Sequence, residues 1–397
     1  MSVDRREVVL VSGVRTAVGE FLGTLAPLTA PQLGAKVIEE TVRRAGIEAG
    51  EVDEVIMGNV VSGGIGQAPA RQAAIAGGIP AEIAVMTINK VCGSGLKAVM
   101  LGAQAIALGD AEIVVAGGLE SMSQVPYYLP KARTGLRMGN AELVDGVIHD
   151  GLWCAFEDKH MGMSAEFTAE RSKITREEQD EYAYNSHKKA LAAIAGGKFK
   201  QEIVPVEVPQ RKGDPIIFDT DERPREDISI EKLAKLRPAF KKDGTVTAGN
   251  APGLNDGAAA VVVMSREEAD RRKIAPMATI TGYAVAGTEP KMLFYAPIYA
   301  VRKLMEKTGA SIGDYDLIEL NEAFSAQALA DGKELGWDWD RVNIHGGAVA
   351  LGHPIGASGA RVLVTLLYAL KDRKKKKGLA VLCLGGGHAV AMSVEMV

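Results

Sequence analysis

Residues 89–118 read NKVCGSGLKAVMLGAQAIALGDAEIVVAGG and combine a glycine-rich corner, a helix pattern and a strand pattern. The corner is NKVCGSG at 89–95, and apolar residues then recur at helical spacing over 96–108. A short apolar run over 112–116 follows and ends at two glycines. This order predicts a helix that leads into a buried strand. Strands that alternate with helices in this way predict an α/β fold.

The same order of elements occurs a second time in residues 356–387, which read GASGARVLVTLLYALKDRKKKKGLAVLCLGGG. A Ser-Gly pair precedes both helix patterns, and a run of glycines ends both strand patterns. The repeat predicts two similar α/β halves packed face to face. Functional loops of both halves would then meet at a shared cleft.

The pattern changes between residues 120 and 249, where prolines and charges follow in irregular order and only 176–194 is clearly helical. This irregular pattern predicts an inserted loop domain. Outside it, residues 31–45 predict a helix with Thr29 as its N-cap, and strand patterns lie at 7–11, 52–60, 258–264 and 278–285. The expected domains are a first half (1–119 plus 250–273), an inserted loop domain (120–249) and a second half (274–397).

Composition excludes several classes of function. The chain has 397 residues, 47% of them hydrophobic, and a formal net charge of −4. This charge gives no general attraction to nucleic acid or to an anionic membrane. The basic run KDRKKKK at 371–377 is expected to be a solvated surface between a helix and a strand. No apolar run is expected to reach the length needed to span a bilayer, the best being a strand at 258–264, and the N-terminus predicts a strand rather than a signal peptide.

Cysteine is rare, with residues only at positions 92, 154 and 383. This number and spacing predict no disulfide framework, and the absence of a CxxC pair predicts no zinc site or other metal centre. Free thiols suit a reducing compartment, so we expect a cytoplasmic protein.

Cys92 lies at a predicted strand-to-helix corner. A thiol at a helix N-terminus faces unpaired N–H groups and the positive end of the helix dipole, which predicts a lowered pKa and a nucleophilic thiolate. The same N–H groups could stabilise an oxyanion. Gly93 and Gly95 are expected to leave room for an acyl group beside the backbone. The alternative is a buried structural cysteine at a tight turn.

Three further side chains could complete such a site. His353 lies in a glycine-rich loop before a helix and could act as a base, although it could equally be an exposed loop histidine. Cys383 ends an apolar strand and, taken alone, could be only a small hydrophobic residue. Asn321 follows the strand pattern at 317–320 and could hold a water or donate to an oxyanion.

Four segments together resemble the motifs of the thiolase family, most closely its biosynthetic acetyl-CoA acetyltransferases. They are NKVCGSG at 89–95, NEAF at 321–324, GHPIGASG at 352–359 and CLGGG at 383–387. The resemblance extends over essentially the whole chain. It implies a layered αβαβα fold of two similar halves with an inserted loop domain that binds coenzyme A and mediates oligomerisation.

The resemblance also implies a mechanism, a Claisen condensation or its thiolytic reversal in fatty acid metabolism. Cys92 would carry the acyl group, His353 would take its proton, and Cys383 would move the α-proton. Asn321 would order a water that forms one oxyanion hole with His353. The N–H groups of Cys92 and Gly385 would form the other. No permanently bound cofactor is implied, because coenzyme A and acyl-CoA are substrates.

Substrate contacts and assembly are implied in the same way. His160 and Met161 resemble the segment that lines the pantetheine tunnel, and Arg225 falls near the adenine end. The remaining residues expected to bind coenzyme A are Leu152, Phe240, Ala248, Leu293 and Phe324. Residues 121–140 resemble the loop through which biosynthetic thiolases form tetramers, so a homotetramer, a dimer of dimers, is expected.

Some positions depart from the family pattern and leave the substrate open. Pro252 stands where the family has a serine that contacts the pantetheine arm, and LFYA at 293–296 replaces smaller residues beside the acyl pocket. His345 and His388-Ala389 are further departures. The alternatives are a 3-ketoacyl-CoA thiolase for longer chains and a non-catalytic scaffold subunit. A ketoacyl synthase would carry histidine or asparagine in place of Cys383.

Overall fold

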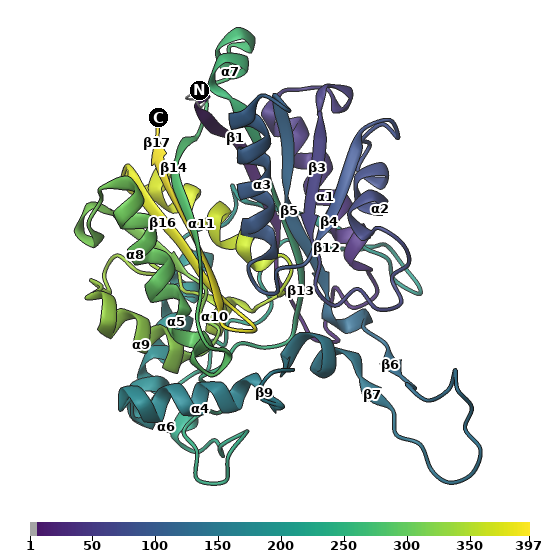
Figure 1. Ribbon diagram of the computed structural model, residues 1–397, viewed down its shortest axis with the longest axis vertical. Helices are drawn as coiled ribbons and strands as arrows, with labels where there is room; N and C mark the ends of the chain where they lie inside the picture. The colour runs from purple at the N-terminus through teal and green to yellow at the C-terminus, as the bar shows by residue number, and fades with distance from the viewer. Residues whose placement is uncertain (1–5) are drawn as a thin grey trace.

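One 11-stranded sheet forms the centre of the molecule, and it consists of two parts with the same strand order, here called the first and the second sheet (Figure 1). The computed structural model describes residues 6–397, so residues 1–5 of the predicted first half lie outside the described residues. In order across the sheet, the first contains β4 (Ala84–Ile88), β3 (Glu54–Gly58), β5 (Ile113–Ser121), β13 (Asn255–Ser265) and β1 (Val8–Thr16). The second contains β15 (Leu317–Leu320), β16 (Lys377–Leu384), β17 (His388–Met396) and β14 (Ala278–Gly287).

Strand pairing repeats from one sheet to the other. In the first, β1 pairs antiparallel with β13, β13 antiparallel with β5, and β5 parallel with β3. In the second, β14, β17, β16 and β15 follow the same sequence of antiparallel, antiparallel and parallel pairs. Val342 bridges in parallel to Ile318 of β15 and takes the place that β4 has beside β3. A short pairing of residues 9–10 of β1 with 278–279 of β14 joins the two sheets. The predicted internal repeat is therefore present in the topology.

Helices cover both outer faces and fill the space between the sheets. Helices α1 (Ala30–Ala45) and α2 (Pro69–Ala76) pack on the first sheet, and α8 (Ala296–Thr308) packs on the second. Helices α3 (Ser94–Leu108) and α11 (Ser358–Arg373) lie together between the sheets and contact strands of both. This order of layers is the αβαβα arrangement expected from the sequence.

Capping residues explain where α1 begins and ends. Thr29 is the N-cap, as predicted, and forms a reciprocal capping box with Gln32. Pro31 lies in the first turn, where its missing N–H has no cost. Gly46 ends the helix with a φ of 69°, a conformation that glycine adopts without strain.

The middle layer requires glycine at two equivalent positions. A Cβ on Gly95 would lie 2.6 Å from the backbone nitrogen of Ala360, and a Cβ on Gly359 would clash with the backbone nitrogen of Leu96. The two Ser-Gly corners therefore pack directly against each other. The prediction that Gly93 and Gly95 leave room for an acyl group is wrong, since a Cβ on Gly93 would meet Leu384 of the core.

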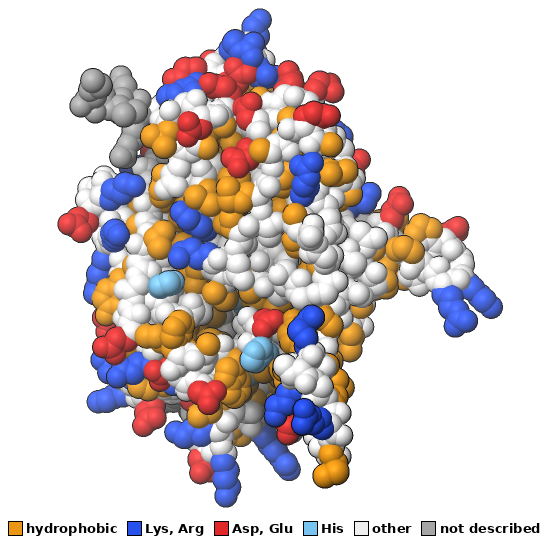
Figure 2. Space-filling model, turned by 45° about the vertical axis from the view of Figure 1, so that its right-hand side comes forward, with side chains coloured by type: hydrophobic (Ala, Val, Ile, Leu, Met, Phe, Trp, Pro, Cys, Tyr) orange, Lys and Arg blue, Asp and Glu red, His pale blue; other side chains and the backbone are white. Residues whose placement is uncertain are grey.

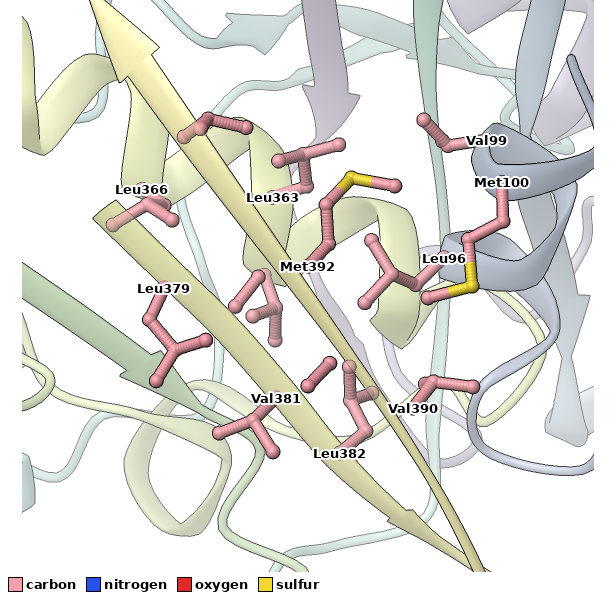
Figure 3. Packing of buried hydrophobic residues seen from close by; sticks show 14 of the residues in the cluster. Leu96, Val99, Met100, Leu363, Leu366, Leu379, Val381, Leu382, Val390 and Met392 are labelled. Atoms are coloured by element: carbon pink, nitrogen blue, oxygen red, sulfur yellow. The ribbon is translucent and has the colours of Figure 1, made fainter. Parts of the chain in front are cut away.

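Apolar side chains from this layer form the centre of the larger core (Figure 3). Leu96, Val99 and Met100 of α3 lie beside side chains of α11, β16 and β17, which include Leu363, Leu366, Leu379, Val381, Leu382, Val390 and Met392. The segment Val91–Leu108 is long and apolar enough to meet a criterion for a membrane span, so the expectation that no run reaches that length is wrong. In the structure, 56% of this segment is buried, and its helix is the core helix α3.

The inserted region is more regular than its sequence predicts. It contains the expected helix as α5 (Arg176–Ala195), but also α4 (Met161–Ser172) and α6 (Ile230–Ala234). Helix α4 was missed because it buries small or polar side chains rather than a bulky apolar stripe, among them Ser164, Ala165, Thr168 and Ala169. The predicted limits of this domain stay a prediction.

A short strand of the inserted region, β10 (Ile203–Val204), pairs with β1 and so connects this region to the body. Within the first half, the short strand β2 (Gly19–Glu20) pairs with β13. The hairpin of β6 (Tyr127–Tyr128) and β7 (Val144–Asp145) projects far from the body (Figure 1). The other short elements are β8 (Trp153–Cys154), β9 (Lys159–His160), β11 (Val206–Val208), β12 (Ile216–Phe218), α7 (Arg266–Arg272), α9 (Ser325–Leu335) and α10 (Ala348–Leu351).

Candidate active site

A cavity of about 560 Å³ opens where loops of both halves meet the inserted region. Its lining includes four of the predicted catalytic residues, Cys92, His353, Cys383 and Gly385. It also includes every residue predicted to bind coenzyme A, namely Leu152, His160, Met161, Arg225, Phe240, Ala248, Leu293 and Phe324. Asn321 does not line the cavity, but its Nδ2 lies 3.5 Å from Nε2 of His353. The structure thus brings the predicted residues to one place.

The loop that carries Cys92 has a strained backbone. Val91 has a φ of 46°, in the left-handed region that β-branched residues avoid. Asn89 Oδ1 accepts from Val91 N at 2.9 Å, and Ser94 Oγ accepts from Lys90 N at 2.8 Å and donates to Val91 O at 2.7 Å. These three bonds hold the strained turn in place, and such strain is a common feature of functional sites. They also explain why the motif needs Asn89 and Ser94.

The environment of Cys92 differs from the sequence prediction. Burial raises the pKa of its thiol to about 12, and the charge of Glu120 acts in the same direction. The N–H groups of Gly385 and of Cys92 itself face the sulfur and oppose this effect. The predicted lowering of the pKa is wrong, because Cys92 precedes the helix cap at Gly93 and packs among apolar residues of distant segments. The resting group is therefore a thiol that needs a base.

His353 is held in the tautomer that a base requires. Its Nδ1 lies 2.6 Å from Ser358 Oγ, and the same hydroxyl donates to the carbonyl of Pro354 at 2.9 Å. Since the hydroxyl has one proton, it accepts from Nδ1–H and leaves a lone pair on Nε2. Burial lowers the pKa of His353 to about 3, assisted by the charge of Arg361. The imidazole is neutral and able to accept a proton.

The backbone of His353 has a support that sequence reasoning missed. Asn255 Oδ1 accepts from His353 N at 2.8 Å, while its Nδ2 donates to Gly19 O. The adjacent Gly352 has a φ of 106°, and a Cβ there would clash with the Asn255 side chain. The available signal is the Asn-Asp-Gly segment at 255–257, which in the sequence indicates only the start of a strand.

Cys383 lies at the end of β16, in an apolar cluster with Leu293, Phe294 and Phe324. Burial raises the pKa of its thiol well above the usual range, and the charge of Cys92 contributes next. The two thiols are thus close enough to influence each other. A sulfur with a raised pKa is a strong base once it has lost its proton.

Asn321 is fully buried and fixed by its neighbour. Its backbone nitrogen donates to Val381 O at 3.0 Å, and its Oδ1 has no hydrogen-bond partner among residues 6–397. The next residue, Glu322, accepts from Tyr182 Oη, Ser186 Oγ, Asn343 Nδ2 and Val349 N at 2.8–3.0 Å. Glu322 therefore holds the loop that presents Asn321. It stands in the NEAF segment, but its role needed partners that are distant in the sequence.

Glu120 connects loops of the two halves. The sequence alone did not single out this residue. Its carboxylate accepts from Gly356 N at 2.8 Å, Val60 N at 3.1 Å, Val61 N at 3.3 Å and Asn59 Nδ2 at 2.7 Å. Burial raises the pKa of Glu120, while these N–H donors act in the opposite direction because each stabilises the carboxylate. The loop after His353 is thereby fixed relative to the first half.

Aromatic rings close the inner end of the cavity. His160 stacks on Phe240 with ring centroids 4.7 Å apart, and its Nδ1 accepts from Gly162 N at 3.0 Å. Phe324 packs edge-on against both Phe240 and Phe294. The three phenylalanine rings belong to the apolar cluster that contains Cys383.

The positions that depart from the family pattern lie in different parts of the structure. Pro252 lines the cavity beside Arg223, a lining residue that the sequence did not single out. His345 is buried against Phe199 and does not line the cavity. Within residues 6–397, no three side chains of His, Cys, Asp or Glu converge in a way that could hold a metal ion.

Comparison with known proteins agrees with this geometry. The family model of the thiolase N-terminal domain matches residues 8–267, and that of the C-terminal domain matches residues 274–396. An acetyl-CoA acetyltransferase of Pseudomonas aeruginosa is 59% identical, and one of Cupriavidus necator is 57% identical, with 98% of this chain and 99% of each relative covered.

A solved structure is also similar. The crystal structure of the Bacillus anthracis acetyl-CoA acetyltransferase matches with a TM-score of 0.98 and 46% sequence identity, and the match covers 100% of both chains. With both family models matched and the fold shared over its full length, the chain belongs to the thiolase family.

Proposed function

We propose that this chain is an acyl-CoA C-acetyltransferase that condenses two acetyl-CoA molecules to acetoacetyl-CoA and free coenzyme A, and catalyses the reverse thiolysis. One observation carries the proposal: Cys92, Cys383 and the neutral imidazole of His353 line a single apolar cavity. Relatives named acetyl-CoA acetyltransferase at more than half identity support the same reaction.

In the first half-reaction, the Cys92 sulfur adds to the carbonyl carbon of acetyl-CoA and its proton passes to Nε2 of His353. The N–H groups of Cys92 and Gly385 stabilise the charge that forms on the carbonyl oxygen. The bond to the coenzyme A sulfur then breaks, and this sulfur takes the proton from His353. The products are acetyl-Cys92 and free coenzyme A.

In the second half-reaction, the Cys383 thiol gives its proton to Nε2 of His353, and the resulting thiolate removes a proton from the methyl group of a second acetyl-CoA. The enolate oxygen is stabilised by His353 and by a water held on Asn321. The enolate carbon attacks acetyl-Cys92, and the Cys92 sulfur leaves and takes the proton from Nε2 of His353, while Cys383 keeps the proton of the methyl group. Acetoacetyl-CoA is released with the starting protonation of both cysteines restored.

The bulky side chains packed around Cys383 support a short acyl group. Leu293 and Phe294 are buried and pack with Phe324 and Cys383, so bulky side chains fill the space where a longer acyl chain would extend. The 3-ketoacyl-CoA thiolase for longer chains is therefore not favoured. The scaffold alternative is not favoured either, since each expected catalytic group is present. The coenzyme arm would run past His160, Met161 and the remaining predicted contacts.

A homotetramer in the cytoplasm, without a resident cofactor, is part of the proposal. The β6–β7 hairpin exposes apolar side chains far from the body, among them Tyr127, Leu136, Met138 and Leu143. Strand β4 has an unpaired outer edge in the described sheet and a partly exposed face. Exposed apolar groups and open strand edges are features that a second copy can cover.

Nucleic acid and membranes are not among the partners that we propose. On the face shown in Figure 2, basic and acidic side chains are interspersed, and no broad surface of one charge is present. This distribution agrees with the small net charge of −4.

Acylation of Cys92 tests the proposal directly. Protein incubated with acetyl-CoA and digested should carry one acetyl group on the peptide that contains Cys92. A series of 3-ketoacyl-CoA substrates should then give the highest kcat/KM for the four-carbon member. Absence of the acetylated peptide, or a preference for longer chains, would contradict the assignment.

A further inference from the structure

Arg223 is a buried cation with no carboxylate partner among the described residues. It is only 5% exposed, and it donates from Nη1 to Val349 O at 3.1 Å and from Nη2 to Ala251 O at 3.0 Å. Arg15, by contrast, pairs with two buried carboxylates, Glu202 and Asp221. Burial of an unpaired charge is costly, and it lowers the pKa of Arg223 to about 10. Such a cost is consistent with a specific role.

One of the two carbonyls belongs to the wall of the active-site cavity. Residues 251–254, APGL, all line the cavity. Within the described chain, the bond from Arg223 to Ala251 O is the only hydrogen bond of this segment. Pro252 has no N–H to donate, and Gly253 lies so close that a Cβ there would be 2.6 Å from Nε of Arg223. The shape of this wall therefore depends on the guanidinium group.

The other carbonyl group, that of Val349, belongs to a helix that other contacts hold in place. Val349 is in α10, and its N–H donates to Glu322 at 2.9 Å. Glu322 holds α10 independently of Arg223. The segment that carries Arg223 is itself anchored on both sides, through Asp221 bound to Arg15 and through Arg225 N, which donates to Nδ1 of the buried His187. Arg223 thus connects an anchored segment and a fixed helix to an otherwise unbonded wall.

We propose that Arg223 is a positioning residue that holds residues 251–254 in the shape that binds the thiol-bearing arm of coenzyme A. The inference rests on the proposed function, because a coenzyme whose sulfur reaches Cys92 through this cavity must pass the wall. The catalytic loops have their own supports in Ser94, Ser358 and Glu120. Loss of the guanidinium group should therefore weaken coenzyme A binding and leave the reactivity of Cys92 intact.

The experiment compares Arg223→Met with the parent enzyme and with Arg211→Met, which changes an exposed arginine of the same inserted region. Thiolysis of acetoacetyl-CoA is measured at varied coenzyme A. Arg223→Met should raise the KM for coenzyme A by about 10-fold, the effect of lost hydrogen bonds to two carbonyls, with kcat little changed. Alkylation of Cys92 by iodoacetamide without coenzyme A should keep the parent rate, and Arg211→Met should match the parent throughout.

Gly253→Ala disturbs the same contact from the wall side and keeps the buried cation. It should also raise the KM for coenzyme A, and the double variant should be no worse than Arg223→Met alone, because both act on one contact. The proposal is overturned if either single variant leaves the KM for coenzyme A unchanged. It is also overturned if the two single effects multiply in the double variant. A parallel loss of kcat and of Cys92 alkylation would show that Arg223 supports the catalytic loops instead. A parent enzyme that forms no acetyl-Cys92 would refute the proposed function itself.

Discussion

The two Ser-Gly corners of the molecule use the same hydroxyl for different tasks. Ser94 accepts from a backbone N–H and donates to Val91 O, which holds the strained turn before Cys92. Ser358 accepts from the imidazole of His353 and donates to Pro354 O. The first copy of the repeat thus positions a backbone that carries a nucleophile, and the second orients a base. The same Ser-Gly corner serves two chemical roles because different groups bind its serine hydroxyl.

The largest expected effects come from removing the two sulfur atoms, that of Cys92 in the first half and that of Cys383 in the second. Cys92→Ala should lower kcat by about 10⁴-fold or more, as loss of a covalent nucleophile does, and should abolish exchange of acetyl groups with coenzyme A. Cys383→Ala should still form acetyl-Cys92 but lose condensation by about 10²–10⁴-fold. Measured exchange and condensation rates check both. Equal loss of exchange in the two variants would contradict the division of roles.

Ser358→Ala should reduce the rate of acylation rather than the stability of the fold. His353 would lose the partner that fixes its tautomer, and a hydrogen bond to a group that becomes charged contributes about 1.5–3 kcal/mol, or about 10–100-fold in rate. The pH profile of acylation is the measurement. Ser358→Thr keeps the hydroxyl and should restore most of the rate, and a failure to do so would argue against this contact.

Ser94→Ala should produce the converse result. Lys90 N and Val91 O would lose their partner, which costs about 1–3 kcal/mol of unfolding free energy. Denaturant unfolding measures this loss, with Ser358→Ala as the matched comparison. A larger loss of stability in Ser358→Ala than in Ser94→Ala would show that the two hydroxyls do not differ as described.

The smallest expected effect is a loss of stability at acidic pH. Residues 8–119 contain no histidine, whereas the second half contains His345 and His353, both buried. Burial lowers the pKa of His345 to about 4. The unfolded chain binds this proton more tightly, so stability falls as the pH decreases from about 6.5 toward 4, by up to about 1.4 kcal/mol per pH unit. Between pH 7.5 and 5.5, His345→Asn should lose about 1 kcal/mol less than the parent, and an equal loss would contradict this assignment.

Much of the fold and of the site was predictable because the information is local. The repeat of a Ser-Gly corner, a helix and a strand is visible in the sequence, and it specified both the middle helices and the loops at the cavity. Cys92, His353 and Cys383 each stand in a distinctive glycine-rich segment. Their convergence followed from the repeat together with the family resemblance.

The errors came from contacts between distant segments. The pKa of Cys92 depends on apolar neighbours and on Glu120, which the order of residues around the cysteine does not reveal. Gly95 is required by Ala360, a residue of the other half. The role of Arg223 depends on Val349 and Ala251, which only the folded chain brings together.

The shared middle layer has a consequence for how the protein folds. Helices α3 and α11 each bury one side against the other and further sides against both sheets. Either half expressed alone would expose the apolar side chains of its middle helix to water, and such surfaces promote aggregation. The two halves should therefore unfold in one cooperative transition. Cleavage of the chain between them should yield fragments that are soluble only when they recombine.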